Sequence, residues 1–197
     1  MTEVQDLARF VERARLQDMS VAALGQLKIR VLDTLGVGIA ALDAAPIGAI
    51  RKLLAALGGR PLATLIGGGS TAPDRAAFFN GALSRYLDFM DSYLAKGETC
   101  HPSDNLGAVL AAAEMRQASG ADFLTALAVA YQVQTRLSDV APVRHRGFDH
   151  TAQGAYAAAA GAAKALGLPA GQIANAIAIS GTANNALRVS RTGALSH

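Results

Sequence analysis

Alanine occupies 43 of the 197 positions, and this excess limits the possible folds more than any other feature of the sequence. Alanine is the strongest helix former and is depleted in strands. Aromatic residues make up only 5% of the chain, and tryptophan is absent. This composition favours closely packed helices over a β-sandwich, so we expect an all-α fold.

Start and stop signals divide the chain into eight predicted helices. Thr2 opens a capping box, Ser20 and Ser103 are helix-capping residues, and Pro46 is typical of a first helical turn. The segment 62–66 is the one predicted strand, followed by three glycines, and the segment 88–102 is expected to be irregular. The expected helices span residues 2–15, 20–39, 46–57, 73–86, 103–118, 121–139, 150–166 and 169–182. No repeat of fixed period and no Ser/Gly-rich linker divides the chain, so residues 1–197 are expected to form a single domain.

Charge and composition exclude several classes of protein. The formal net charge is +3, without a lysine run or arginines interleaved with aromatics, so we do not expect nucleic-acid binding. The first six residues are acidic rather than basic, and the most apolar late stretch, 155–168, is too short to span a bilayer. We therefore expect a cytoplasmic protein without a membrane anchor. The single cysteine, Cys100, excludes a disulfide framework within the chain.

Two familiar chemistries are disfavoured by spacing. Cys100 lies beside His101, but adjacent side chains rarely face each other, so an ordinary unreactive thiol is expected. A metal site of two histidines and one carboxylate could be drawn from His101, Asp104, His145 and His150. The spacings of these residues match no compact ligand motif. We therefore expect no metal and no other cofactor.

The chemically richest residues lie at two loop-to-helix junctions, 88–105 and 148–151. His101 precedes one predicted helix and His150 begins another, and helix N-termini present free N–H groups that bind anions. Histidine exchanges protons near neutral pH. Asp88 and Asp91 would share a face if the preceding helix continued, and a carboxylate there could act as a base or orient a histidine. Ordinary helix caps and structural histidines would produce the same pattern, so spacing alone leaves both interpretations open.

Motifs along nearly the whole chain resemble the MmgE/PrpD family, whose members include 2-methylcitrate dehydratase and cis-aconitate decarboxylase. The matching segments are FNGA (79–82), YLDFMD (86–91), GETCHPSDN (97–105), LTA (124–126), YQV (131–133), FDHT (148–151) and ALGL (165–168). Because they occur in order, they are more specific than any single motif.

The resemblance implies a large all-α domain with a smaller α+β lid, and metal-independent enzymes that usually form homodimers. It implies a lyase that eliminates water from a 2-hydroxy tricarboxylate by abstracting a proton next to a carboxylate. By this resemblance the catalytic residues are Asp88, His101 and His150, and the substrate-binding residues are Ser92 and Thr151. The central expectation is that Asp88, His101 and His150 meet in one pocket.

Two departures from the family pattern limit what the resemblance implies. Met90 stands where many relatives have a third acidic residue, so the sequence does not define which tricarboxylate is used. Dehydration, decarboxylation and epimerisation are not distinguished either, because the resemblance implies that residues of the lid decide between them. The chain is also shorter than family members and is expected to be an N-terminal part of the helical domain without the lid. Its last residues, 191–197, resemble the run that leads to a substrate-holding lysine. The alternatives are a catalytically silent helical fragment that self-associates or pairs with a complete subunit and, less favoured by the spacing, a metal-dependent enzyme.

Overall fold

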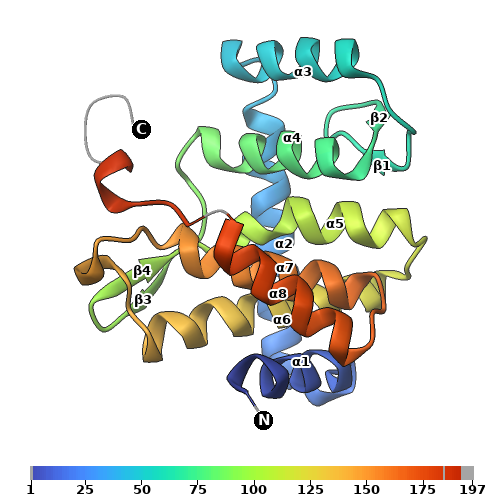
Figure 1. Ribbon diagram of the computed structural model, residues 1–197. Helices are drawn as coiled ribbons and strands as arrows, with labels where there is room; N and C mark the ends of the chain where they lie inside the picture. Colours follow the sequence, from blue (N-terminus) through green and yellow to red (C-terminus); the bar gives the residue numbers. More distant parts are fainter. Residues whose placement is uncertain (1, 184, 192–197) are drawn as a thin grey trace.

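Eight α-helices make up most of the computed structural model, which describes residues 2–183 and 185–191 and confirms the all-α fold (Figure 1). The helices are α1 (Glu3–Arg13), α2 (Val21–Ala40), α3 (Ala45–Leu57), α4 (Pro73–Tyr86), α5 (Leu106–Met115), α6 (Gly120–Val140), α7 (Thr151–Ala165) and α8 (Ala170–Ala183). Short 3₁₀ turns are η1 (Leu16–Asp18), η2 (Pro102–Asn105), η3 (Arg144–Arg146) and η4 (Arg188–Arg191).

Most helix boundaries follow from local chemistry. The Thr2 N–H donates to Gln5 Oε1 at 2.9 Å, and Ser20 Oγ accepts from the Ala23 N–H at 3.1 Å. These side chains satisfy donors that a helix start would otherwise leave free. Gly58 ends α3 with a positive φ of 64°, a conformation that glycine adopts without strain.

The sheet content differs from the prediction in two places. The predicted strand is only Ala63–Thr64 (β1), which pairs with Ser70–Thr71 (β2) across the glycine turn. The prediction of an irregular segment before residue 102 is wrong, because Tyr93–Ala95 (β3) and Glu98–Cys100 (β4) form an antiparallel hairpin. A hairpin this short is only marginally stable by itself. Tyr93 Oη connects it to α6 by donating to the two oxygens of the Asp139 carboxylate, at 2.9 and 3.0 Å.

Small side chains bring α7 close to α5, α6 and α8, which it contacts most extensively (Figure 1). Ala157 and Ala160 are fully buried. At Gly161 an added Cβ would lie 2.7 Å from Val109 Cγ2 on α5 and 2.8 Å from Ala130 Cβ on α6. The abundance of alanine therefore reflects interhelical distances that larger side chains would not permit.

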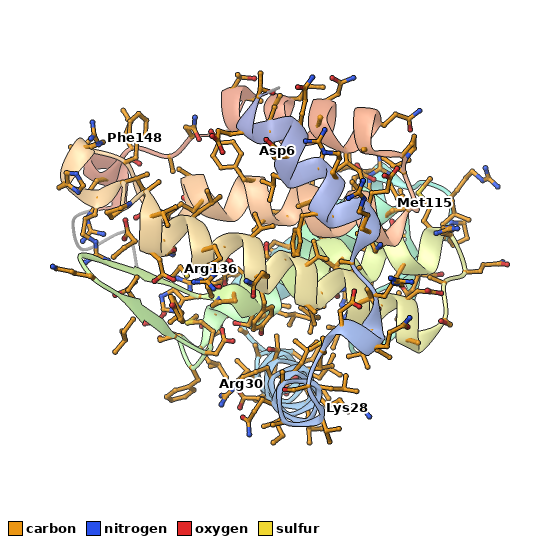
Figure 2. The ribbon with its side chains drawn as sticks, turned by 90° about the horizontal axis from the view of Figure 1, so that it is seen from below. Asp6, Lys28, Arg30, Met115, Arg136 and Phe148 are labelled. Carbon is orange, nitrogen blue, oxygen red and sulfur yellow. The ribbon has the colours of Figure 1, made fainter. Side chains whose placement is uncertain are left out.

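At the edge of the bundle, α2 exposes a set of large apolar side chains. Figure 2 shows it nearly end-on, apart from the other helices, with Lys28 and Arg30 on its surface. Its most exposed apolar residues are Val21, Ile29, Leu32 and Ile39. Within the described residues, no single helix has the length and apolar composition needed to cross a bilayer; α2 and α3 meet both criteria only when combined, and a bend of 90° separates them.

Replacing Gly161 by alanine tests the close packing of α7. Overpacking is expected to cost about 1–3 kcal/mol, more than the roughly 1 kcal/mol by which alanine is favoured over glycine within a helix. Gly36→Ala in α2, where a Cβ meets nothing within 4 Å, is the control and should raise stability slightly. Urea unfolding measures both variants. An unfolding midpoint for Gly161→Ala equal to that of Gly36→Ala would contradict the packing argument.

Candidate active site

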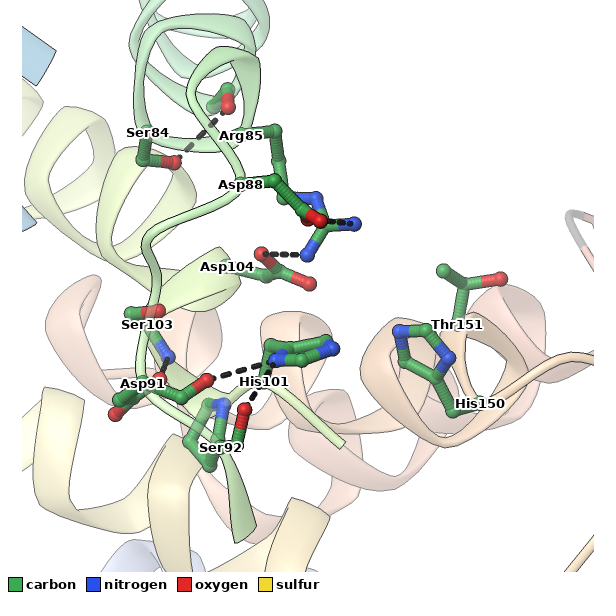
Figure 3. Close-up of polar contacts among 12 residues, drawn as sticks. Ser84, Arg85, Asp88, Asp91, Ser92, His101, Ser103, Asp104, His150 and Thr151 are labelled. Carbon is green, nitrogen blue, oxygen red and sulfur yellow. Dashed lines mark hydrogen bonds and ion pairs between the residues drawn. The ribbon is translucent and has the colours of Figure 1, made fainter. Parts of the chain in front are cut away.

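Two histidines distant in sequence face each other at one edge of the bundle. His101 follows β4 and precedes η2, and His150 is the N-cap residue of α7. Their ring centroids lie 5.2 Å apart with the ring planes inclined by 76° (Figure 3). His150 is buried, and His101 is partly exposed. The structure thus brings together two of the three residues expected to be catalytic.

The hydrogen bonds of His101 define which of its ring nitrogens carries a proton. Nδ1 lies 2.7 Å from the backbone carbonyl oxygen of Asp91, and a carbonyl can only accept, so Nδ1 is the donor. Ser92 Oγ lies 3.3 Å from the same nitrogen. In the neutral ring, Nε2 therefore holds the lone pair, and Figure 3 shows this nitrogen on the side that faces His150. His101 is arranged as a proton acceptor.

His150 is oriented by its neighbour in the chain. Its Nδ1 lies 3.2 Å from Oδ1 of Asp149, whose carboxylate is 1% exposed. The same oxygen accepts from the Thr151 N–H at 3.1 Å, and Arg188 lies 3.7 Å from Oδ2. Asp149 thus accepts from the first backbone N–H of α7 and also fixes the plane of the His150 imidazole.

Asp91 organises the His101 side of the site, a role that the sequence analysis did not assign to it. Its Oδ1 accepts from the Ser103 N–H at 3.0 Å, and its Oδ2 accepts from Tyr131 Oη at 2.9 Å. Burial, together with the negative charge of Asp91, raises the pKa of Tyr131 far above its usual value. The prediction that Ser103 caps a helix is wrong, because its backbone is held by Asp91 and α5 begins only at Leu106.

Asp88 lies at the edge of the site, and among the described residues its charged partner is Arg85 rather than either imidazole. The expectation that it shares a helix face with Asp91 is wrong, since α4 ends at Tyr86 and Asp88 has a φ of 56°. Its exposed carboxylate lies 3.9 Å from Arg85, whose other terminal nitrogen lies 3.6 Å from Asp104. Figure 3 shows these three charged groups together above the His101 ring.

The two expected substrate-binding hydroxyls border the histidine pair. Ser92 contacts His101, as described above. Thr151 Oγ1 is buried and forms no hydrogen bond within the described residues. A hydroxyl that can donate and accept in this position could bind a polar ligand group.

A cavity of about 970 Å³ lies beside the site rather than around the histidines. Asp91, Ser92 and Tyr131 form part of its wall, and the opposite wall comes from α1, η1 and the first half of α2. Neither His101 nor His150 lines it. The chemical groups, rather than this cavity, therefore define the candidate site.

No set of three or more His, Cys, Asp or Glu side chains within the described residues is arranged to hold a metal ion. This includes the four residues that the sequence analysis considered, His101, Asp104, His145 and His150. The two histidines are instead positioned by oxygen acceptors, Asp91 O and Asp149 Oδ1.

Comparison with known proteins confirms the family resemblance. Residues 5–197 match the MmgE/PrpD N-terminal domain. The 2-methylcitrate dehydratase of Escherichia coli K12 is 32% identical, over 96% of this chain and 41% of its own length. That of Cupriavidus necator is 32% identical over 94% of this chain and 40% of its length, and the probable 2-methylcitrate dehydratase of Saccharomyces cerevisiae is 32% identical over 95% and 39%.

The chain belongs to the MmgE/PrpD family. It spans about two fifths of the length of these relatives and corresponds to the N-terminal domain of the family. The run from 191 to 197, which resembles the approach to a substrate-holding lysine, lies outside the described residues from Thr192 onward. The candidate site lies among α4 to α7 and the loops that connect them.

Cys100, next to His101 in sequence, is fully buried, and burial raises the pKa of its thiol to about 11 from 9.0. At pH 8 this lowers the thiolate fraction about 100-fold, and the thiolate is the reactive form. Iodoacetamide should therefore alkylate the folded chain at least ~100-fold more slowly than the urea-unfolded chain, measured by mass spectrometry. Equal rates would show that Cys100 is accessible and ionised, against the structure.

Proposed function

We propose that this chain carries the proton-transfer site of a hydro-lyase that removes water from a 2-hydroxy tricarboxylate. The observation that carries the proposal is the pair of facing imidazoles, each with its Nδ1 held by an oxygen acceptor. Relatives named 2-methylcitrate dehydratase support the class of reaction, and 2-methylcitrate is the substrate we propose to test first.

Dehydration requires a base for the C–H bond and an acid for the departing hydroxyl. In the proposed step, His101 Nε2 takes the proton from the carbon next to a carboxylate, and the C–H electrons form the new C=C bond. The C–O bond breaks, and its oxygen receives a proton from His150 to leave as water. The buried Asp149 carboxylate beside His150 balances the charge of an imidazolium, which favours His150 as the acid.

Substrate carboxylates require cationic and hydroxyl partners. Arg85 has two ion pairs, at 3.6 and 3.9 Å, both longer than hydrogen bonds, and its buried Nη1 has no hydrogen-bond partner within the described residues. A guanidinium binds a carboxylate through two parallel hydrogen bonds. We propose that Arg85 holds one substrate carboxylate, that Ser92 and Thr151 contact the substrate, and that Asp88 serves catalysis by orienting Arg85.

Three further features belong to this proposal. Residues 1–197 would be the N-terminal portion of a helical domain, the active protein would be a homodimer, and it would act in the cytoplasm. The second candidate function is a catalytically silent helical chain that associates with itself or with a complete subunit. The observation that favours it is the exposed apolar surface of α2, where Val21 is 90% and Leu32 is 72% exposed.

Histidine substitutions distinguish the two candidates. We expect the protein to dehydrate 2-methylcitrate, and His101→Gln and His150→Gln each to lower kcat about 10²–10⁴-fold, the usual contribution of positioned proton transfer. His145→Gln, an exposed histidine on η3, is the control and should leave kcat unchanged. Absorbance of the unsaturated product measures turnover.

Turnover that survives both substitutions would remove the histidine pair from the mechanism. A wild-type chain that neither binds nor converts 2-methylcitrate would favour the silent candidate.

Arg85→Gln tests carboxylate recognition separately from proton transfer. Loss of a charged pair of hydrogen bonds costs about 1.5–3 kcal/mol, so KM for 2-methylcitrate should rise roughly 10–100-fold, with a smaller change in kcat. Arg136→Gln is a matched control, because Arg136 also has a long ion pair, 3.8 Å from Asp139, on an exposed helix face. Equal KM values for the two variants would exclude Arg85 as a substrate ligand.

A further inference from the structure

We propose that Glu98 is a positioning residue that holds His101 and His150 at their working separation by joining the two segments that carry them. Its role in catalysis rests on the proposed function, whereas its effect on the histidine geometry does not. Glu98 belongs to β4, and its side chain is fully buried. It forms no direct contact with either imidazole, so it would act through the backbone.

The carboxylate of Glu98 connects β4 to the 3₁₀ turn η3. Oε2 accepts from the backbone N–H groups of Val143 and Arg144, both at 3.0 Å. Oε1 accepts from the Thr99 N–H at 3.2 Å and lies 3.4 Å from the Arg144 guanidinium Nε. Three backbone donors and one cation therefore surround a single buried carboxylate.

Both connected segments lead directly to a histidine. His101 is the first residue after β4, so it follows Glu98 closely on the same hairpin. The η3 turn ends at Gly147, with a φ of 85°, and continues through Asp149 to His150. On the far side, Asp149 N–H donates to Ala186 O at 2.9 Å and the Arg188 N–H to Gly147 O at 2.8 Å. Glu98 thus anchors this loop from the hairpin side, and the segment before η4 anchors it from the other.

The buried charge of Glu98 suits a residue that fixes the position of η3 relative to β4. Taking a carboxylate out of water is costly and is offset only when donors of good geometry surround it. An apolar side chain would fill the same space, but it could not accept from the two amides that begin η3, which would then lack a partner. The 5.2 Å ring separation is therefore held by directional hydrogen bonds rather than by packing alone. Displacement of a reacting group by an ångström can lower a rate about 100-fold.

Glu98→Gln tests the proposal, with Glu114→Gln as the matched control. Glutamine keeps the size of Glu98 but provides one accepting oxygen instead of two and no charge. Glu114 also accepts from a backbone amide, Thr64 N–H, but at the other end of α5. In Glu98→Gln we expect the nuclear Overhauser effects between the His101 and His150 ring protons to weaken and their imidazole resonances to move. We also expect kcat for 2-methylcitrate to fall at least about tenfold with KM nearly unchanged. Glu114→Gln should leave all of these at wild-type values.

The outcomes separate this proposal from the proposed function. A folded Glu98→Gln chain with unchanged imidazole resonances and unchanged ring-to-ring effects overturns the positioning role, whatever its stability. Changed imidazole signals in a protein without dehydratase activity support the positioning role and contradict the proposed function. If Glu98→Gln does not fold, Arg144→Gln loosens the same contact from its exposed side, and the same signals should move in the same direction by a smaller amount. Imidazole signals unchanged in Arg144→Gln would then overturn the proposal.

Discussion

The close approach of α7 to α5 and α6 determines where the chemistry can occur. Gly161 and the neighbouring alanines allow backbones to approach to a distance at which even one added methyl group would collide with Val109 and Ala130. His150 caps the start of α7, and His101 lies just before the turn that leads into α5. The distance between the packed helices determines where α5 and α7 begin. Small residues such as Gly161, which take no part in proton transfer, therefore help to bring the two imidazoles together. The same alanines that predict a helical bundle are therefore part of the reason that the bundle has a site.

Carboxylates that accept backbone N–H groups hold the loops at that site. Asp91 holds Ser103, Glu98 holds the start of η3, and Asp149 holds Thr151 at the first turn of α7. Each satisfies donors that a loop or a helix start would otherwise leave without a partner. Because a backbone amide cannot move far without breaking such a bond, the imidazoles are attached to segments of fixed geometry rather than to flexible loops.

Local signals predicted the helices well, because caps, prolines and helical spacing act over a few residues. They failed where tertiary contacts decide the structure. The β3–β4 hairpin is too short to be recognised by alternation and depends on the contact from Tyr93 to Asp139. Serine is a common helix-capping residue, so the sequence predicts that α5 begins at Ser103, whereas Asp91 holds the Ser103 backbone and α5 begins at Leu106. The pairing of the histidines was implied by family resemblance, since no sequence spacing specifies that two helix starts meet. The sequence indicates that Asp88 and Asp91 are important, but their separate roles depend on where α4 ends.

Some charged side chains of the site have close partners within the protein, whereas Arg85 has only long ion pairs and could bind a substrate carboxylate. The buried carboxylate of Glu98 is matched by three backbone donors and Arg144, and that of Asp149 by one backbone donor and Arg188. These two carboxylates therefore add little net repulsion toward an anionic ligand. Arg85 differs, because its two acidic neighbours lie beyond hydrogen-bond distance and one of them, Asp88, is largely exposed. An exposed ion pair of this kind contributes about 0–1 kcal/mol, whereas a carboxylate bound bidentately to a partly buried guanidinium gains more. Under the proposed function, a substrate carboxylate would replace these weak ion pairs of Arg85, while the two histidines keep their positions. The proposed elimination of water would use both parts, the histidines for proton transfer and Arg85 to hold a substrate carboxylate.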